Sequence, residues 1–368
     1  MGTGRARLVL VAAGGTGGHL FPAESLGVAL ARRGIALDLA TDARAVHYGG
    51  GFPARATHVI PSSALHGRDP LAFAKTGLII GVGIVTAWAL LLRLRPIVVV
   101  GFGGYPTIPP ILAAVLRGIP TVIHEQNSVM GRANRLLAPR VTAIATGFRG
   151  VGLSDPKLAA KITWVGNPVR PAVILAAAKP YMPPEAGGPL RLLVFGGSQG
   201  ARIMAEIVPP AIQRLEPALW PRLHIVQQAR EEDVGAVKAA YAELRVSAEV
   251  APFFADLPAR MAASHVVVSR SGASTVAELA AIGRPSILVP LPHALDQDQM
   301  ANAGVLEKAG GAIRVPQPEF TPDRLASEIS ALAAEPARLA AMAAAARKAG
   351  TLDAAERLAD LVLRVAKG

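Results

Sequence analysis

Short apolar runs alternate along the chain with glycine-rich loops and with longer stretches of helical patterning. The run at 8–13 has the continuous apolar character of a strand that is buried on both faces of a parallel sheet. It leads into a glycine-rich segment at 14–19 and then into a helical stretch at 22–33, which Gly34 closes. Further apolar runs, each followed by a glycine-rich or polar loop, lie at 35–40, 97–100 and 120–123. The alternation predicts an α/β fold with a doubly wound parallel sheet.

The same opening recurs in the second half of the chain, where a predicted strand at 191–195 runs into a second glycine-rich loop and a helix. We therefore expect two Rossmann-like domains, at 1–168 and 169–351. The alanine-rich tail predicts helices, and the last of them, at about 352–368, is expected to pack back onto the first domain. Further strand-like runs of the second domain lie at 223–226, 266–269 and 286–289.

Charge and composition narrow the class of partner. The net charge of +12 calls for an anionic partner, such as a phosphate-bearing metabolite, an acidic lipid or nucleic acid. Aromatic residues make up only 4% of the chain, and no helix-turn-helix, zinc-finger or aromatic RNA-binding signature occurs, so nucleic acid is not expected. Because the chain has no cysteine, disulfides, thiolate catalysis and zinc–thiolate sites are excluded.

One segment, at 76–92, stands apart because its 17 residues carry no charge. Basic residues bracket it, with Lys75 before it and Arg93 and Arg95 after it. A membrane-spanning helix needs about 20 apolar residues, and the strand pattern that follows disfavours a span. Two interpretations remain: a buried crossover helix, or an exposed apolar patch with a cationic rim that dips into an anionic bilayer surface.

The glycine loops do not match the common nucleotide-binding motifs. The first loop has Leu20 where the dinucleotide fingerprint needs glycine, and no Walker loop is present. Glycines nevertheless let backbone N–H groups approach a phosphate or a sugar beside a helix N-terminus. His19, directly after this loop, is the candidate general base, or else a structural histidine that bonds the loop. The polar residues at 124–127 follow a predicted strand, at the sheet edge where ligands bind.

Two acidic motifs of the second half have alternative interpretations. Glu278 lies three residues after Thr275, as in a capping box, but its two oxygens also suit the hydroxyls of a ribose. Asp296 and Asp298 form a D-x-D tripeptide, a pattern that holds a divalent metal in glycosyltransferases of a different, single-domain fold. In a Rossmann-like domain, helix N-termini and loop amides supply positive potential instead, so we expect no metal site.

Seven motifs in order over nearly the whole chain resemble the bacterial MurG family of N-acetylglucosaminyltransferases. The chain departs from the family pattern at Asp298, in the last of these motifs, where some members of the family carry glutamine or histidine. The motifs are GGTGGHLFPA, GFGGYPTIPP, HEQNSVMGRAN, VGNPVR, VFGGSQGAR, RSGASTVAELAAIGRPSILVPLPHA and DQDQMANA.

The resemblance implies a GT-B fold, with two Rossmann-like domains facing across a cleft that holds the donor. It implies an inverting transfer of N-acetylglucosamine from UDP-N-acetylglucosamine to the C4 hydroxyl of undecaprenyl-pyrophosphoryl-N-acetylmuramoyl-pentapeptide, with no cofactor or metal. It also implies peripheral attachment to the anionic cytoplasmic face of the inner membrane. The alternatives are a transferase of this fold with another acceptor and a nucleotide-sugar-binding protein without turnover.

The resemblance also assigns roles to individual residues. His19 would be the base, and Glu278 would bind the ribose. The residues expected on the sugar and acceptor side are Thr16, Gly17, Gly18 and Asn127; those near the diphosphate are Arg170 and Ser198; the backbone of Phe254 would meet uracil, Gln299 the donor sugar, and Ala273, Ser274 and Thr275 would complete the donor site.

Overall fold

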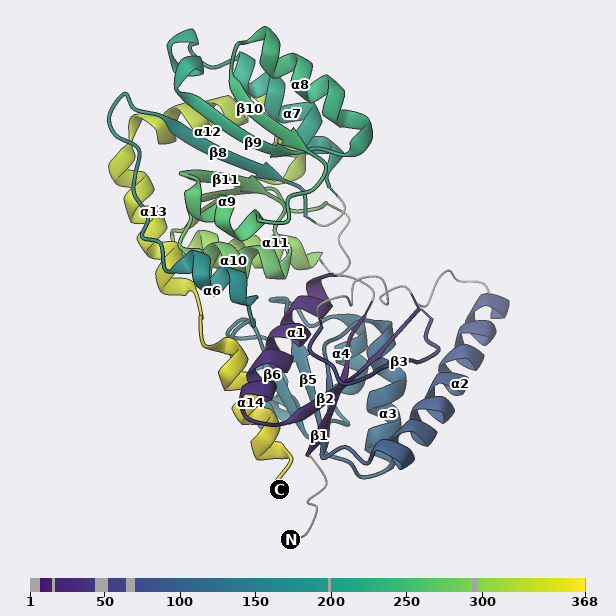
Figure 1. The fold of residues 1–368 in the computed structure, drawn as a ribbon. Helices are drawn as coiled ribbons and strands as arrows, with labels where there is room; N and C mark the ends of the chain where they lie inside the picture. Colours follow the sequence, from purple (N-terminus) through teal and green to yellow (C-terminus); the bar gives the residue numbers. More distant parts are fainter. Residues whose placement is uncertain are drawn as a thin grey trace. The chain divides into compact units, whose positions relative to one another are not determined.

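The chain folds into two compact units that are each built on a parallel sheet (Figure 1). The first unit comprises Met1–Arg170 and Leu352–Gly368, and the second comprises Pro171–Thr351. The computed structural model describes residues 7–14, 17–43, 52–63, 70–197, 200–292 and 297–367, without the side chains of 70–72.

The sheet of the first unit has seven strands in the order β3-β2-β1-β4-β5-β6-β7, and each strand pairs in parallel with its neighbours. Every residue of β1 and β4 is buried, which explains their uninterrupted apolar sequences. The strand order reverses between β1 and β4, so the loops after these two strands diverge and leave room for a ligand. The strands are β1 (Leu8–Ala12), β2 (Ala36–Thr41), β3 (Thr57–Val59), β4 (Val98–Gly101), β5 (Thr121–Glu125), β6 (Ala143–Thr146) and β7 (Ile162–Trp164).

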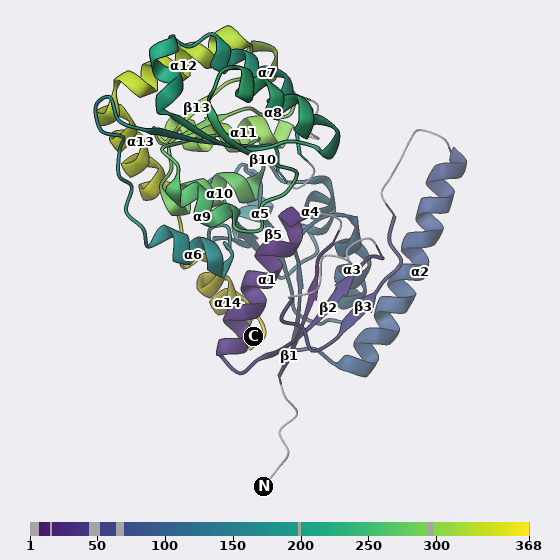
Figure 2. The same cartoon turned by 45° about the horizontal axis from the view of Figure 1, so that its top comes forward.

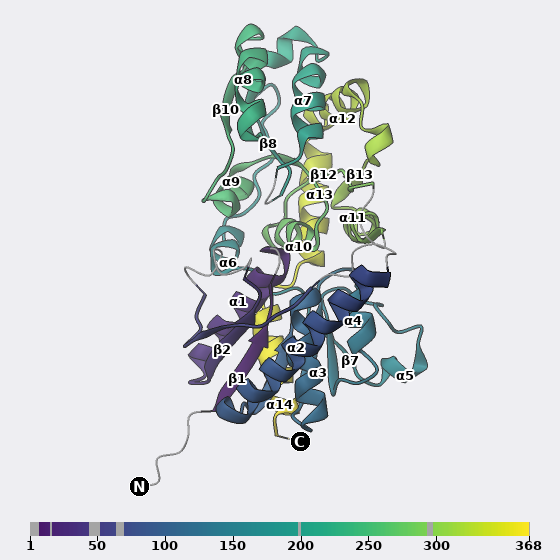
Figure 3. The same cartoon turned by 90° about the vertical axis from the view of Figure 1, so that its right-hand side faces the viewer.

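Helices cover both faces of this sheet. On one face α1 and α14 share a core with the strands, and α2 and α3 pack together on the other side (Figures 1 and 3). The predicted helix at 22–33 begins earlier than expected, at Gly17, which places His19 in its first turn. The helices are α1 (Gly17–Arg32), α2 (Pro70–Leu94), α3 (Ile108–Leu116), α4 (Arg132–Leu137), α5 (Pro156–Ala159) and α14 (Ala354–Val365), with a 3-10 turn η2 (Tyr105–Thr107).

The helix α14 belongs to the first unit although it follows the whole second unit in sequence. Its apolar side is fully buried against the core, with Leu358 and Val362 both at 0% exposure. Arg33 fastens its outer side, donating to Asp360 at 2.6 Å and to Glu356 at 2.8 Å. Apolar burial supplies most of this docking energy, since half-exposed ion pairs contribute little in water.

The second unit repeats the design with a six-stranded parallel sheet in the order β10-β9-β8-β11-β12-β13. The helices α7, α8 and α12 cover one face, and α9 and α10 cover the other (Figure 2). The two parallel sheets confirm the predicted α/β fold with two Rossmann-like domains. The strands are β8 (Leu190–Phe195), β9 (Leu223–Gln228), β10 (Ser247–Ala251), β11 (Val266–Ser269), β12 (Ser286–Leu288) and β13 (Ala312–Arg314). The helices are α6 (Pro171–Ala177), α7 (Arg202–Gln213), α8 (Val234–Glu243), α9 (Leu257–Ala263), α10 (Ala273–Ile282), α11 (Asp298–Lys308), α12 (Pro322–Ala334) and α13 (Pro336–Ala349), with 3-10 turns η3 (Pro217–Arg222), η4 (Glu231–Asp233) and η6 (Gln317–Glu319).

A buried polar network ties together three backbone segments of the first unit. The His124 ring nitrogen Nε2 lies 3.1 Å from the Gly166 carbonyl oxygen, and the Gln126 amide donates to the Phe102 carbonyl at 3.0 Å. The same Gln126 nitrogen lies 3.1 Å from Nδ1 of His124, and Asn167 donates to the Gln126 carbonyl at 2.8 Å. The pattern requires a neutral His124 that donates through Nε2 and accepts through Nδ1.

Stability of the first unit should therefore depend on pH through His124. Burial lowers the pKa of His124 from 6.5 to about 4, while its hydrogen bond to the Gly166 carbonyl opposes the change. Above pH 6.5 the His124 ring is neutral in both the folded and the unfolded chain. Between pH 6.5 and about 4, only the unfolded chain binds the proton. We expect the free energy of unfolding to fall by about 3 kcal/mol between pH 6.5 and 4 because of this group.

Urea unfolding at a series of pH values checks this expectation. His124→Phe should be less stable than the wild type at pH 7.5 but should lose less stability on acidification. His224→Ala, which replaces an exposed histidine of the second unit, serves as the matched control. Parallel profiles for His124→Phe and the wild type would show that His124 does not carry the effect.

Candidate active site

In the first unit, the ring of His19 lies against the glycine loop that follows β4. Gly103 and Gly104 have φ angles of +80° and +72°, which side chains rarely tolerate. A Cβ atom added at either position would come within 3.5 Å of the His19 ring. The structure thus brings together the loops after β1 and β4, the two strands at which the strand order reverses.

The surroundings of His19 favour its neutral form. Burial lowers the pKa of His19, and a hydrogen bond with the Gly14 backbone opposes that shift. A neutral imidazole at pH 7 is the form that can accept a proton from a hydroxyl. Gly17 and Gly18 share the first turn of α1 with His19, whereas Thr16 lies outside the described residues.

The segment after β5 is organised by the buried carboxylate of Glu125. It accepts hydrogen bonds from the Asn127 backbone N–H at 2.9 Å, the Gly131 N–H at 2.9 Å and the Asn134 side chain at 2.8 Å. Burial raises the pKa of Glu125, and these donors oppose the rise. Since Glu125 has its oxygens committed to the loop, its role is to hold the loop that carries Asn127. A Cβ atom added at Gly103 would lie 3.3 Å from the Asn134 side-chain amide. The segment after β5 therefore adjoins the loop after β4, which in turn contacts His19.

Arg170, the last residue of the first unit, lies beside helix α1. Its guanidinium carbon is 4.4 Å from the centre of the Phe21 ring, a cation–π contact that orients the charge. Burial raises the pKa of the Glu24 carboxyl on the same helix, and the charge of Arg170 opposes that rise. Arg170 therefore adds positive charge beside the N-terminal half of α1, the helix whose first turn carries His19.

In the second unit, the glycine loop after β8 turns so tightly that its first residue must be glycine. A Cβ at Gly196 would come within 2.2 Å of the Ala201 nitrogen, and Gly197 and Gly200 have φ angles of +88° and +69°. Ser198, predicted to reach the diphosphate, lies outside the described residues. The described part of the loop thus has the close-approach geometry expected of a phosphate-binding turn.

The helix α10 begins differently from the capping-box interpretation. Its N-cap is Gly272, with no side-chain cap, so Thr275 and Glu278 lie inside the helix. The capping role considered for Glu278 is therefore wrong, and the residue is buried, with 5% of its surface exposed. Ala273, Ser274 and Thr275 begin the helix and Glu278 follows within the next turn, so the predicted donor residues of this motif all lie on one helix.

A direct contact joins the starts of α10 and α11. The Ser271 hydroxyl donates to the Gln299 carbonyl at 2.8 Å, and Asn302 donates to the Ser271 carbonyl at 3.3 Å. The side-chain oxygen of Gln299 accepts from the Leu291 N–H at 3.1 Å. The structure thus brings Gln299 next to the predicted donor segment of α10.

Phe254 lies in the loop between β10 and α9, with its ring buried at 8% exposure. Arg260 covers the ring at 4.3 Å and is itself held by Asp256 and Glu249, each at 2.7 Å.

Sequence reasoning missed Gln228, whose side chain joins the Phe254 loop to the Gly196 loop. The available signal was a polar residue at the carboxyl end of a strand, but the predicted strand stopped at 226.

The D-x-D tripeptide is only partly described. The Asp298 carboxylate accepts from the Gln299 N–H at 2.7 Å, as expected of an acidic residue in the first turn of a helix. Asp296 lies outside the described residues. Among the residues that are described, no group of three or more histidines and carboxylates is placed to hold a metal ion.

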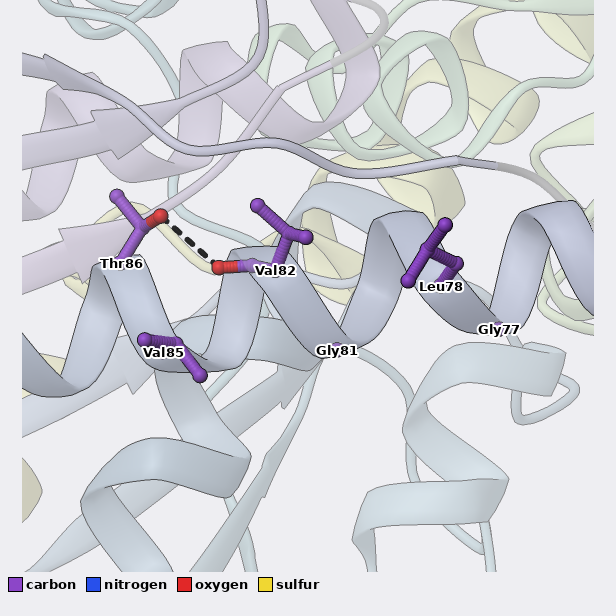
Figure 4. A pocket seen from close by; sticks show the side chains of 6 residues that line it. All are labelled: Gly77, Leu78, Gly81, Val82, Val85 and Thr86. Atoms are coloured by element: carbon purple, nitrogen blue, oxygen red, sulfur yellow. Dashed lines mark hydrogen bonds between the residues drawn. The ribbon is translucent and has the colours of Figure 1, made fainter.

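The helix α2 presents an apolar surface away from the sheet, so the buried-crossover interpretation of 76–92 is wrong for this face. The stretch Phe73–Leu94 has a mean hydropathy of 2.1 and is only 22% buried, so by length and composition it could cross a membrane. Leu78 and Val85 are 70% and 71% exposed. Figure 4 shows the residues of α2 that line an apolar pocket on its surface, namely Gly77, Leu78, Gly81, Val82, Val85 and Thr86.

Comparison with known proteins gives concordant results. The family description "Glycosyltransferase family 28 N-terminal domain" matches residues 9–146, and "Glycosyltransferase family 28 C-terminal domain" matches 191–358. A protein of Rhodopseudomonas palustris (strain BisB18) is 65% identical over 98% of this chain and 96% of its own length. A protein of Bradyrhizobium diazoefficiens is 65% identical over 98% of both chains. Both are named UDP-N-acetylglucosamine–N-acetylmuramyl-(pentapeptide) pyrophosphoryl-undecaprenol N-acetylglucosamine transferase.

Solved structures agree with these relatives. The crystal structure of Acinetobacter baumannii MurG superposes with a TM-score of 0.79 at 29% identity, covering 97% of this chain and 99% of that one. A UDP-GlcNAc 2-epimerase from Neisseria meningitidis shares the fold, with a TM-score of 0.68 at 13% identity over 97% and 100% of the two chains. The chain has the GT-B class of fold, and it belongs to glycosyltransferase family 28 and, within it, to the MurG family.

Proposed function

We propose that the chain transfers N-acetylglucosamine from UDP-N-acetylglucosamine to the C4 hydroxyl of undecaprenyl-pyrophosphoryl-N-acetylmuramoyl-pentapeptide, a step in peptidoglycan synthesis. The observation that carries the proposal is the 62–66% identity, over nearly the full length, to relatives named for this transfer. The glycine loop after β8 and the start of α10 after β11 leave neighbouring strands at the carboxyl edge of the second sheet, and Ser271 joins this start to Gln299, which supports a nucleotide-sugar donor there.

The reaction that we propose is a single inverting displacement. The acceptor hydroxyl attacks the anomeric carbon, His19 takes the hydroxyl proton, and the bond from the anomeric carbon to the diphosphate oxygen breaks to release UDP. Negative charge grows on the diphosphate as this bond breaks. Backbone amides of the Gly196 loop, Ser198 and Arg170 would stabilise that charge, so no metal or cofactor is needed.

The remaining candidate residues divide between donor and acceptor. Glu278 would accept the ribose hydroxyls, and the backbone at Phe254 would meet the uracil. Gln299 would bind the donor sugar through its amide nitrogen, since its oxygen already accepts from Leu291. The residues that would contact the sugar and the acceptor are Thr16, Gly17, Gly18 and Asn127. The residues on the helix of Glu278 that would complete the donor site are Ala273, Ser274 and Thr275.

Release of UDP from UDP-N-acetylglucosamine tests the function directly. We expect release only when a lipid-linked muramoyl-pentapeptide is present, with a disaccharide lipid as the second product. Release with some other acceptor alone would assign a different transfer. Tight UDP binding without release under any acceptor would make the chain a nucleotide-sugar-binding protein without turnover.

His19→Ala should lower turnover by about 10²–10⁴-fold, the usual loss when a general base is removed. UDP affinity should survive, because the base acts on the acceptor hydroxyl. Steady-state kinetics and calorimetry with UDP separate the two effects, with His224→Ala as an exposed-histidine control. An equal fall in UDP affinity and turnover would mean that His19 shapes the loop and that another group is the base.

Glu278→Ala should weaken UDP binding by about 1.5–3 kcal/mol, the range for a hydrogen bond to a charged group. The wild type should bind UDP more tightly than 2′-deoxy-UDP, and Glu278→Ala should lose most of this preference. Calorimetry with both nucleotides checks this coupling. A variant that keeps the wild-type preference and only melts at a lower temperature would show that Glu278 is structural.

We further propose that the enzyme attaches peripherally to the anionic cytoplasmic face of the inner membrane through α2. The relatives' names specify an undecaprenol acceptor, which resides in a membrane. Exposed apolar side chains of α2 would enter the bilayer surface, at about 25 cal/mol per Å² of buried area. Lys75, Arg93 and Arg95 would each add about 1 kcal/mol near an acidic leaflet. Arg117 extends the cationic rim, with its guanidinium 5.1 Å from the Trp88 ring.

Replacing Leu78 and Val85 together by aspartate should abolish binding to vesicles that contain phosphatidylglycerol, because it removes apolar burial and adds repulsion. The matched control replaces Leu175 and Met182, which are equally exposed in the second unit, by aspartate and should leave vesicle binding intact. Co-sedimentation measures both, and high salt or carbonate should strip the wild type from vesicles. Retention through carbonate would indicate a spanning helix, and indifference to anionic vesicles would exclude membrane attachment through α2.

A further inference from the structure

The strand β9 lies between β8 and β10 in the second sheet. Its last residue, Gln228, is therefore within reach of the loops that follow both neighbouring strands. Gln228 is paired in register with Ala251 of β10 and is buried at 7% exposure. A buried side-chain amide is expected to use its hydrogen-bonding groups, and Gln228 uses both.

The two ends of the Gln228 amide bond to different loops. Its oxygen accepts from the Gly196 N–H at 3.1 Å, and its nitrogen donates to the Pro252 carbonyl at 3.1 Å. The position demands an acceptor and a donor on one side chain. An ionised glutamate cannot donate, a lysine cannot accept, and a methionine of similar size cannot donate and accepts only weakly.

These two loops are the ones that the proposed function assigns to opposite ends of UDP. Gly196 opens the loop whose following amides would meet the diphosphate, and Pro252 precedes the backbone of Phe254, which would meet the uracil. We propose that Gln228 is a positioning residue for the donor nucleotide. It sets the spacing between the diphosphate loop and the base-binding loop without touching the ligand, and this inference rests on the proposed function.

A neighbouring glutamine provides a matched control. Gln227 points to the opposite face of β9, where its nitrogen donates to the Met204 carbonyl at 3.2 Å and its oxygen accepts from the Tyr241 hydroxyl. Gln227 is fully buried, and its two hydrogen bonds go to residues of the helices α7 and α8 instead of the loop backbones that Gln228 joins. Gln227→Met and Gln228→Met thus remove the same chemistry from the same strand on opposite faces.

The test measures the affinities of UDP, uridine and inorganic pyrophosphate for the full chain by calorimetry and competition. Gln228→Met should lower the UDP affinity and raise the KM for UDP-N-acetylglucosamine about tenfold, with the KM for the acceptor unchanged. Uridine and pyrophosphate, which each engage one loop, should lose much less. Gln227→Met should lower the melting temperature but keep the wild-type ratio of UDP to uridine affinity.

Gln228→Glu adds a second, pH-dependent measurement. The ionised carboxylate should repel the Pro252 carbonyl and weaken UDP binding more than methionine does. Its protonation restores a donor, so the affinity gap to the wild type should narrow as the pH falls toward about 4.5. A gap that does not change with pH would contradict the need for a donor at this position.

The outcomes separate this inference from the proposed function. Wild-type UDP affinity in Gln228→Met would overturn the inference, and so would equal losses for UDP and uridine, since the defect would then lie in one loop. A wild type that binds neither UDP nor UDP-N-acetylglucosamine would instead overturn the proposed function.

Discussion

Parallel strand pairing is the constraint on which the rest of the structure depends. In a parallel sheet all carboxyl ends lie on one edge, and the loops that leave this edge carry backbone groups that the sheet cannot pair. In both units, tight glycine turns and buried polar side chains satisfy the hydrogen bonds of these backbone groups. The first unit uses Glu125 and His124, and the second uses Gln228. The same groups that satisfy the backbone also hold the candidate site residues in place.

The two units meet the constraint with different chemistry. In the first unit a carboxylate and a neutral imidazole are buried, and we expect their protonation to weaken the loops that they hold. In the second unit an uncharged amide joins the loops, next to the place proposed for a diphosphate. A neutral connector there leaves the positive potential of the loop amides undiminished, whereas a carboxylate would oppose it.

Much of the fold could be predicted from the sequence because buried parallel strands are continuous apolar runs, and β1, β4, β8 and β11 have that pattern. The strands β3 (Thr57–Val59) and β10 (Ser247–Ala251) were missed because they are short, partly exposed edge strands without it. The capping-box alternative failed at Thr275 because Gly272 begins the helix, a choice made by the loop geometry. Gln228 was not identified from the sequence, because the predicted strand stopped at 226 and the two loops that its side chain joins are far apart along the chain.

The docking of α14 has a consequence for how the chain is made. The core of the first unit includes Leu358 and Val362, which follow the entire second unit in sequence. During translation from the N-terminus, the second unit can therefore complete its core while the first still exposes the apolar surface that α14 covers. The unit that is translated first is thus the last to complete its core, and its uncovered apolar surface stays exposed until α14 has been made.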